Sequence, residues 1–179
     1  MFAWQWCLLS FMAVVHTALG VKANYERVEQ LDNKEYMNFD LRIRKFNRTA
    51  VTLNGTVYIN RPIDQSFVCS SNAFLSRLGN QQFAHSPLHL PTANMCEFMD
   101  HINEEYSAVI ADVVNFPKKS ECPITERTMY VKDKLFPTEV LPRPLSVGLW
   151  KMEFTAKLEN VEVIKLSASI RLSDDYSGF

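Results

Sequence analysis

Cysteines are the residues whose chemistry constrains this chain most. Cys7 lies in an apolar N-terminal stretch, and Cys69, Cys96 and Cys122 lie in the remainder. Because no Cys-x-x-Cys pair is present, the spacing does not favour a zinc site. In an oxidising compartment, three thiols leave one over. We predict a Cys96–Cys122 disulfide, with Cys69 either free or paired between two chains.

The histidines offer little support for a metal site. His85 and His89 are four residues apart, a spacing that would place both on one face of a helix. Pro87 lies between them, and proline is disfavoured in a helix interior. We interpret them as two loop histidines and expect no metal.

Catalytic signatures are missing from the sequence. It contains no Gly-x-Ser-x-Gly elbow, no His-Glu-x-x-His motif and no phosphate-binding glycine loop. Cys69 could act as a nucleophile, but nothing identifies a base, and the preceding Phe67 and Val68 indicate a buried thiol. Asp174 and Asp175 fit a solvated tail better than a catalytic carboxylate pair. We therefore expect no enzymatic activity and no cofactor.

An amphipathic helix is the element that positions two of the cysteines. Apolar residues recur at spacings of three and four and share one helical face. They are Met95, Phe98, Met99, Ile102, Tyr106, Val109, Ile110 and Val113. Asn94 and Glu97 fit a capping box at its start, and Pro117 ends it. The pattern predicts one helix of about five turns. A Cys96–Cys122 bridge would tie both ends of this helix and stabilise the fold by roughly 3–4 kcal/mol.

The N-terminal stretch has the features of a secretory signal peptide. Residues 1–20 carry no charged side chain and end in Ala18-Leu19-Gly20, a small-x-small cleavage site. We predict cleavage before Val21, with slippage to Asn24, and an uncleaved membrane anchor is the alternative. Residues 21–179 would then form a single secreted, extracellular domain.

Composition excludes several classes of protein. The chain has 19 basic and 20 acidic residues, and this near-neutral balance argues against nucleic acid as a partner. Hydrophobic residues make up 47% of the chain, which excludes an intrinsically disordered protein.

Period-two alternation marks several strands. Apolar and polar residues alternate over residues 37–44, which predicts a half-buried strand. Residues 50–59 form a second strand-like run, interrupted by the hairpin dipeptide Asn54-Gly55. Asn47 and Asn54 each begin a sequon, so both are candidate N-glycosylation sites. Residues 21–33 are polar and are expected to be a loose lead-in with a short strand.

The middle of the chain is more irregular. Residues 66–78 predict a strand followed by a turn, and the prolines in residues 83–91 predict an extended edge segment. Residues 128–131 fit a short strand. Three prolines make residues 136–144 an irregular crossing or edge.

A long antiparallel hairpin closes the chain. Residues 150–158 and 164–172 each alternate between apolar and polar side chains. Glu159-Asn160 can turn the chain, and the change of phase at Val163-Ile164 indicates a β-bulge. With the other strands, this hairpin predicts a mainly β protein, an antiparallel β-sandwich with one helix.

Apolar residues on half-buried strands allow two interpretations. The interior is either a filled core or a sandwich held open around a cavity for an acyl chain. Nine residues are candidates for contact with such a ligand. They are Phe67, Phe74, Phe98, Ile102, Trp150, Met152, Phe154, Ile164 and Leu166.

The order of motifs resembles a known family. Cys96-Glu97-Phe98 opens the helix, Cys122-Pro123 follows it, and Gly148-Leu149-Trp150 precedes the final hairpin. Over roughly residues 37–172 this order resembles a large arthropod family of small secreted proteins with a domain of unknown function. That family is distantly similar to ML-type lipid-recognition domains, the ganglioside activator protein and the CheB chemosensory proteins. The resemblance implies an immunoglobulin-like β-sandwich or cup that takes lipid between its sheets.

Three functions follow from these observations as hypotheses. The first is a secreted, monomeric carrier or presenter of a lipid or small hydrophobic ligand, which in chemosensory relatives implies a role in signalling and a membrane receptor. The second is an extracellular interaction protein with a filled core that binds a receptor through its loops. The third is a secreted hydrolase of unrecognised type.

Overall fold

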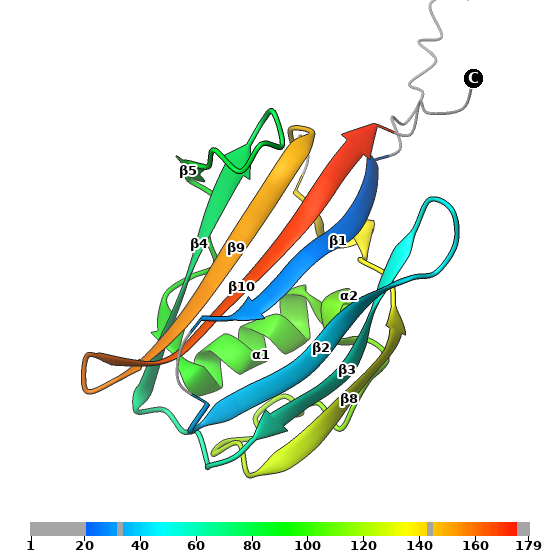
Figure 1. The fold of residues 1–179 in the computed structure, drawn as a ribbon. Helices are drawn as coiled ribbons and strands as arrows, with labels where there is room; N and C mark the ends of the chain where they lie inside the picture. Colours follow the sequence, from blue (N-terminus) through cyan, green and yellow to red (C-terminus); the bar gives the residue numbers. More distant parts are fainter. Residues whose placement is uncertain (1–20, 32–33, 143–144, 175–179) are drawn as a thin grey trace, which may run out of the picture.

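Two antiparallel sheets make up most of the chain (Figure 1). The computed structural model describes residues 21–31, 34–142 and 145–174, so the predicted signal peptide lies outside the described residues. The larger sheet has the order β1 (Val21–Gln30), β10 (Val161–Asp174), β9 (Gly148–Leu158), β4 (Phe67–Ser76) and β5 (Ala84–Ser86), with β6 (Ala93–Asn94) also on β4. The smaller sheet has the order β2 (Met37–Lys45), β3 (Val51–Ile59), β8 (Arg127–Lys134) and β7 (Val113–Val114). The predicted mainly β sandwich is confirmed.

The hairpin of β9 and β10 forms the centre of the larger sheet and follows the prediction closely. Glu159 and Asn160 turn the chain with φ of 50° and 67°, values that a two-residue hairpin turn requires. The register shifts between Glu162 and Ile164, which confirms the predicted bulge. Beyond the bulge, Met152 lies opposite Ala168.

The first strand differs from its prediction. β1 is ten residues long and pairs with β10 along its whole length, whereas a loose lead-in was expected. A register shift between Tyr25 and Arg27 explains the difference, because this bulge changes the parity of the inward-facing residues halfway along the strand. No single period of two is therefore visible in the sequence.

The Asn54-Gly55 dipeptide is not a hairpin turn, and this prediction is wrong. β3 continues through it, with a register shift between Leu53 and Gly55 against β8. Gly55 has φ of 138°, and a Cβ there would lie 2.0 Å from the Asp40 carbonyl oxygen on β2. The glycine permits a bulge and a close backbone approach inside the strand.

The helix is shorter than predicted and is followed by a second one. α1 (Met95–Glu105) begins at Asn94, whose side chain accepts a hydrogen bond from the Glu97 amide at 3.0 Å, as the capping prediction required. α1 ends at Tyr106, and the single turn of α2 (Ser107–Ile110) follows. Val113 and Val114 then pair with β8 as β7. Two β-branched residues thus join a sheet in place of the last turn of the expected helix.

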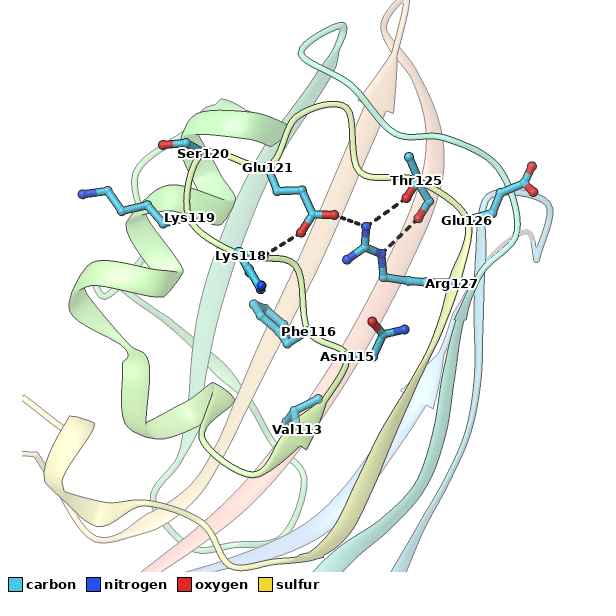
Figure 2. Close-up of a pocket in the computed structure, with 10 residues that line it drawn as sticks. All are labelled: Val113, Asn115, Phe116, Lys118, Lys119, Ser120, Glu121, Thr125, Glu126 and Arg127. Atoms are coloured by element: carbon cyan, nitrogen blue, oxygen red, sulfur yellow. Dashed lines mark hydrogen bonds and ion pairs between the residues drawn. The ribbon is translucent and has the colours of Figure 1, made fainter.

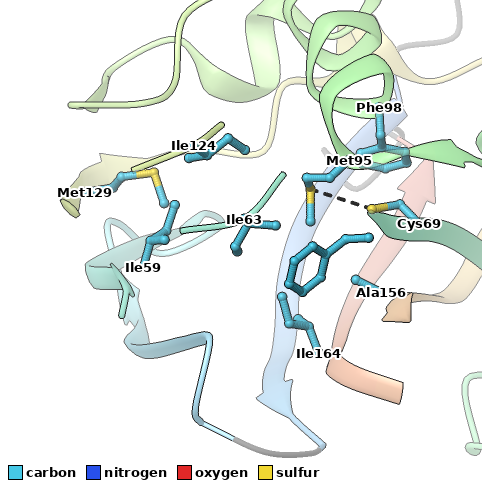
Figure 3. Packing of buried hydrophobic residues seen from close by; sticks show 10 residues of the cluster. Ile59, Ile63, Cys69, Met95, Phe98, Ile124, Met129, Ala156 and Ile164 are labelled. Atoms are coloured by element: carbon cyan, nitrogen blue, oxygen red, sulfur yellow. Dashed lines mark hydrogen bonds between the residues drawn. The ribbon is translucent and has the colours of Figure 1, made fainter. Parts of the chain in front are cut away.

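A filled core occupies the half of the sandwich around α1. Ile59 and Met129 of the smaller sheet pack with Ile164 of the larger sheet and with Met95 and Phe98 of α1 (Figure 3). Figure 1 shows α1 between the two sheets at this level. Because both sheets and the helix contribute buried side chains, this half has the close packing of an ordinary protein interior.

Cys69 lies in this core as a free thiol. It is 0% exposed, and its Sγ is 3.6 Å from the Met95 Sδ (Figure 3). Burial raises the pKa of the Cys69 thiol to about 12. The partner of Cys96 is Cys122, with 5.7 Å between their Cα atoms, so the predicted pairing is present.

We expect Cys69 to resist thiol reagents until the protein unfolds, since the thiolate is the reactive form. The native thiol keeps a proton that the unfolded chain releases above about pH 9, so the free energy of unfolding should fall as pH rises from about 9 towards 12, by roughly 1.4 kcal/mol per pH unit. Denaturation of the wild type and Cys69→Ala between pH 8 and 10.5 measures this slope. Rapid labelling of native Cys69, or equal slopes in the two proteins, would contradict the assignment.

A second buried cluster lies in the other half of the sandwich, and all of its residues belong to the larger sheet. Ala73, Trp150, Ile170 and Leu172 form it. The partly buried residues packed against it come from the larger sheet and from loops, and none comes from the described strands of the smaller sheet. The larger sheet is therefore covered here by loop segments, which come from before α1 and from the crossing after β8.

Candidate functional site

An apolar cavity lies beneath this covering. Its volume is about 400 Å³, within the range of about 300–1,000 Å³ typical of small-molecule sites. The residues that line it come from β1, β9 and β10, from the loop before α1, from α1 and α2, and from the crossing after β8. They are Tyr25, Leu88, His89, Leu90, Ile102, Tyr106, Val109, Phe136, Val140, Leu141, Pro142, Leu145, Trp150, Met152, Ala168 and Ile170.

The floor of the cavity is the inner face of the larger sheet. Trp150 and Met152 of β9 lie opposite Ile170 and Ala168 of β10, and Tyr25 of β1 lies opposite Ile170 on its other side. Met152 and Ala168 occupy central strand positions facing the interior, yet both are only half-buried. Incomplete burial at the middle of a sheet is expected where a cavity takes the place of packed side chains.

Two covers close the cavity from above. The first is the end of α1 with α2, which supplies Ile102, Tyr106 and Val109. The second is the crossing after β8, where the 3-10 helix η1 (Thr138–Val140) and its neighbours supply Phe136 and other apolar side chains. The break between α1 and α2 at Tyr106 lets the chain bend over the sheet here, because the Tyr106 backbone has left the helical conformation.

Lys134 holds α2 over the cavity. Its side chain is 9% exposed, and its ammonium donates hydrogen bonds to the carbonyl oxygens of Ala108 at 2.8 Å and Ala111 at 2.6 Å. These bonds satisfy carbonyls that the end of a helix leaves without partners. The cover that contains Val109 is thus fixed to β8 by one buried cation.

Lys134→Met should destabilise the protein by roughly 1–3 kcal/mol, because it leaves two carbonyls unsatisfied while the methionine keeps the apolar stem. Lys132→Met is the matched control, since Lys132 is exposed on the same strand, and a change within about 0.5 kcal/mol is expected for it. Chemical denaturation measures both variants. Equal stability of the two would show that the Lys134 hydrogen bonds do not fix the cover.

Among the described residues of the lining, four have polar side-chain atoms, and two of these four make a hydrogen-bonding contact within the protein. The Trp150 indole donates to the Ser146 carbonyl oxygen at 2.9 Å, and the His89 Nδ1 lies 2.8 Å from the Pro87 carbonyl oxygen. Tyr25 packs edge to face against Phe136 with ring centroids 5.5 Å apart, and burial raises the pKa of Tyr25 to about 12. The surface offered to a ligand is therefore apolar and aromatic.

Three of the nine predicted ligand residues line the cavity: Ile102, Trp150 and Met152. Five others lie in or against the filled core and are not among the residues that line this cavity. They are Phe67, Phe98, Phe154, Ile164 and Leu166. Phe98 and Phe154 contact each other, with ring centroids 5.1 Å apart.

Phe74, the ninth predicted residue, lies on the outer face of the larger sheet. Its ring packs against His85, and the Lys151 ammonium is 4.6 Å from the ring centroid. Conversely, Tyr25, Ala168 and Phe136 line the cavity without having been among the candidates. Alternation along β10 already placed Ala168 on the inner face, whereas no sequence signal marked Tyr25 or Phe136.

A second, polar pocket of about 810 Å³ is lined by side chains from residues 113–121 and from residues 125–127 at the start of β8 (Figure 2). Two of its charged side chains are bound to each other: Arg127 forms an ion pair with Glu121 and also donates to the Thr125 hydroxyl at 2.9 Å. Hydrogen bonds from Arg127 and from the Lys118 amide lower the pKa of the Glu121 carboxyl. We interpret this network as a structural support for the loop that carries Cys122.

The two sequon asparagines differ in their surroundings. Asn47 is exposed at the turn between β2 and β3, and its Oδ1 accepts from the Thr49 and Ala50 amides at 2.9 and 2.8 Å. Asn54 is half-buried; its Nδ2 donates to Thr52 Oγ1 at 3.1 Å, and its Oδ1 accepts from the Asp133 amide at 2.9 Å. Glycosylation at both sites remains a prediction, and the geometry favours Asn47.

The described residues contain no cluster of three or more metal-ligating side chains. The two histidines four apart lie on β5 and in the loop after it, so they do not share a helix face. Nor does any helix among the described residues combine the length and the hydropathy needed to cross a bilayer.

Comparison with known proteins adds no relative. No protein-family model matches the chain, and no curated protein matches it. The resemblance to lipid-recognition families therefore stays a prediction, and the functional argument rests on the geometry of the cavity.

Proposed function

We propose that this protein is a secreted carrier or presenter of a lipid or another small hydrophobic molecule. The observation that carries the proposal is the cavity of about 400 Å³ between the larger sheet and its two covers. Among the described residues that line it, none has a carboxylate, ammonium or guanidinium group. Such a space is unfavourable for water and favourable for an alkyl chain.

The two interpretations of the interior apply to different halves of the molecule. Around α1, the sheets enclose a filled core, which supplies the stability of the fold. At the other end, the second cluster leaves room beside Trp150 and Met152. A stable frame with an adjacent cavity suits a binding protein, because the ligand can enter without disrupting the core.

The disulfide supports the secreted part of the proposal. Disulfides persist in oxidising compartments, and the Cys96–Cys122 bridge joins the helix to the loop after β7. Secretion also agrees with the signal peptide predicted over residues 1–20.

The affinity expected for a ligand follows from its buried surface. Burial of about ten methylene groups contributes roughly 8 kcal/mol, from which association removes at least about 4 kcal/mol. Aromatic contacts with Trp150 and Tyr25 add to the favourable side. The net of about 4 kcal/mol corresponds to a dissociation constant of roughly 1 mM, and two aromatic contacts of about 0.5–1.5 kcal/mol each lower it. We therefore expect dissociation constants between roughly 10 µM and 1 mM for single-chain ligands.

Fluorescence titration with diphenylhexatriene, a hydrocarbon dye that emits strongly in apolar surroundings, tests the proposal. We expect saturable binding of one dye per chain and its displacement by dodecanol. A linear, non-saturating rise in fluorescence with the folded protein would contradict a carrier function.

A further inference from the structure

The described residues of the cavity lining carry no formal charge, and this property selects among hydrophobic ligands. None of the residues that line the cavity in the described part of the chain is Asp, Glu, Lys or Arg. We infer that the cavity takes an uncharged single-chain amphipath, such as a fatty alcohol, aldehyde or ester, whose oxygen is bound by the Tyr25 hydroxyl. This inference rests on the proposed carrier function and narrows its ligand class.

Tyr25 is the group placed to bind the ligand's oxygen. It projects from β1 onto the cavity floor, opposite Ile170, and its ring is held by Phe136. Its hydroxyl forms no hydrogen bond with any residue in the described part of the chain. A tyrosine hydroxyl keeps its proton at neutral pH and can donate to a ligand oxygen, and burial raises the pKa of Tyr25 further, to about 12.

Other polar groups of the lining are less suited to this role. The Trp150 indole already donates its hydrogen bond to the Ser146 carbonyl oxygen. The Nδ1 of His89 already contacts the Pro87 carbonyl oxygen. His89 is exposed, which places it at the margin of the cavity. Tyr106 is half-buried in the cover, next to His101. Among the residues that form the floor of the cavity, Tyr25 is the one with a hydroxyl group.

An ionised carboxylate has no cationic counterpart among the lining residues that the structure describes. A buried anion needs a cation or several hydrogen-bond donors to offset the loss of water, whereas an alcohol or ester needs one donor. Among the described residues, the cation nearest in sequence to the second cover is Lys134, and it is already bound to the carbonyl oxygens of Ala108 and Ala111. Of two ligands with the same alkyl chain, the lining therefore favours the uncharged one over the carboxylate.

Displacement of diphenylhexatriene by dodecanol, dodecyl acetate and dodecanoate at about pH 8 tests the inference, because histidine is largely uncharged there. We expect dodecanol and dodecyl acetate to displace the dye at concentrations at least tenfold below those needed for dodecanoate. Equal or tighter binding of dodecanoate would overturn the inference while leaving the carrier function standing. Failure of the dye itself to bind saturably would contradict both.

Tyr25→Phe tests the role of the hydroxyl. It should weaken dodecanol binding about two- to tenfold and leave the affinity for diphenylhexatriene unchanged, since the dye has no polar atom. Tyr130→Phe is the matched control, because Tyr130 is 52% exposed on the smaller sheet. Unchanged dodecanol affinity in a folded Tyr25→Phe protein, or an equal loss for the dye, would contradict the assignment.

Discussion

Ala168→Trp should abolish binding of diphenylhexatriene, with at least a fiftyfold loss of affinity, while the fold remains intact. Ala168 faces the cavity from the centre of β10, and an indole there would occupy the space that a ligand needs. Because the new side chain enters an existing cavity, the free energy of unfolding should stay within about 1 kcal/mol of the wild type, or rise slightly.

Ala156→Trp provides a matched comparison on the neighbouring strand. Ala156 is 0% exposed in the filled core, so the same substitution should overpack that core and destabilise the protein by at least 1–3 kcal/mol. Its folded fraction should still bind the dye. Dye titration and chemical denaturation of both variants give four values. Retained dye binding in folded Ala168→Trp would show that the ligand lies elsewhere. If Ala168→Trp does not fold, dye binding by the smaller replacement Ala168→Leu makes the same test.

Removal of the disulfide should have the largest effect on stability. The bridge closes a loop with a sequence separation of 26, and its loss in Cys96→Ser/Cys122→Ser should cost about 3.5 kcal/mol. For a chain of this size the Tm should fall by roughly 10 °C. The bridge anchors the first turn of α1, and the far end of α1 covers the cavity, so dye binding should weaken as well.

Thermal denaturation of the double variant, with Cys69→Ala alongside it, measures this contribution. Peptide mapping without reductant should show Cys96 joined to Cys122 and Cys69 unmodified. A Tm within 2 °C of the wild type, or a peptide linking Cys69 to either partner, would contradict the stabilising role assigned to the bridge.

Alternation along the strands predicted most of the larger sheet. In the β9–β10 hairpin the polar and apolar residues alternate along each strand and change phase at Val163-Ile164, so the inner face, the turn and the bulge were all visible in the sequence. The same rule excludes one of the predicted ligand residues. Phe67 and Phe74 are an odd number of positions apart on β4, so they must point to opposite faces, and Phe74 lies outside.

The cavity itself was beyond the reach of local patterns. Tyr25 lies on β1 just before the bulge that hides its alternation, and Phe136 lies in a proline-rich crossing without a period. Their meeting depends on how the crossing folds back over the larger sheet, which is a long-range property. Which apolar residues fill a core and which leave a space likewise depends on the packing of both sheets.

Asn54-Gly55 illustrates a different difficulty. The dipeptide favours positive φ at glycine, and both a hairpin turn and a β-bulge use that conformation. The choice is made by pairing with β8, because the Asn54 side chain binds the Asp133 amide across the bulge. The sequence correctly indicated a position that requires glycine. Pairing with β8 then determined that this position is a bulge and not a turn.

Native mass spectrometry of the protein purified from its own source tests the central claim most directly. The account predicts a complex with one bound molecule per chain, whose mass difference disappears on solvent extraction and corresponds to a neutral single-chain lipid. It also predicts that Ala168→Trp, expressed in the same way, carries no such mass. An unliganded wild type that acquires no dodecanol on incubation would contradict the claim that the cavity binds a hydrophobic ligand.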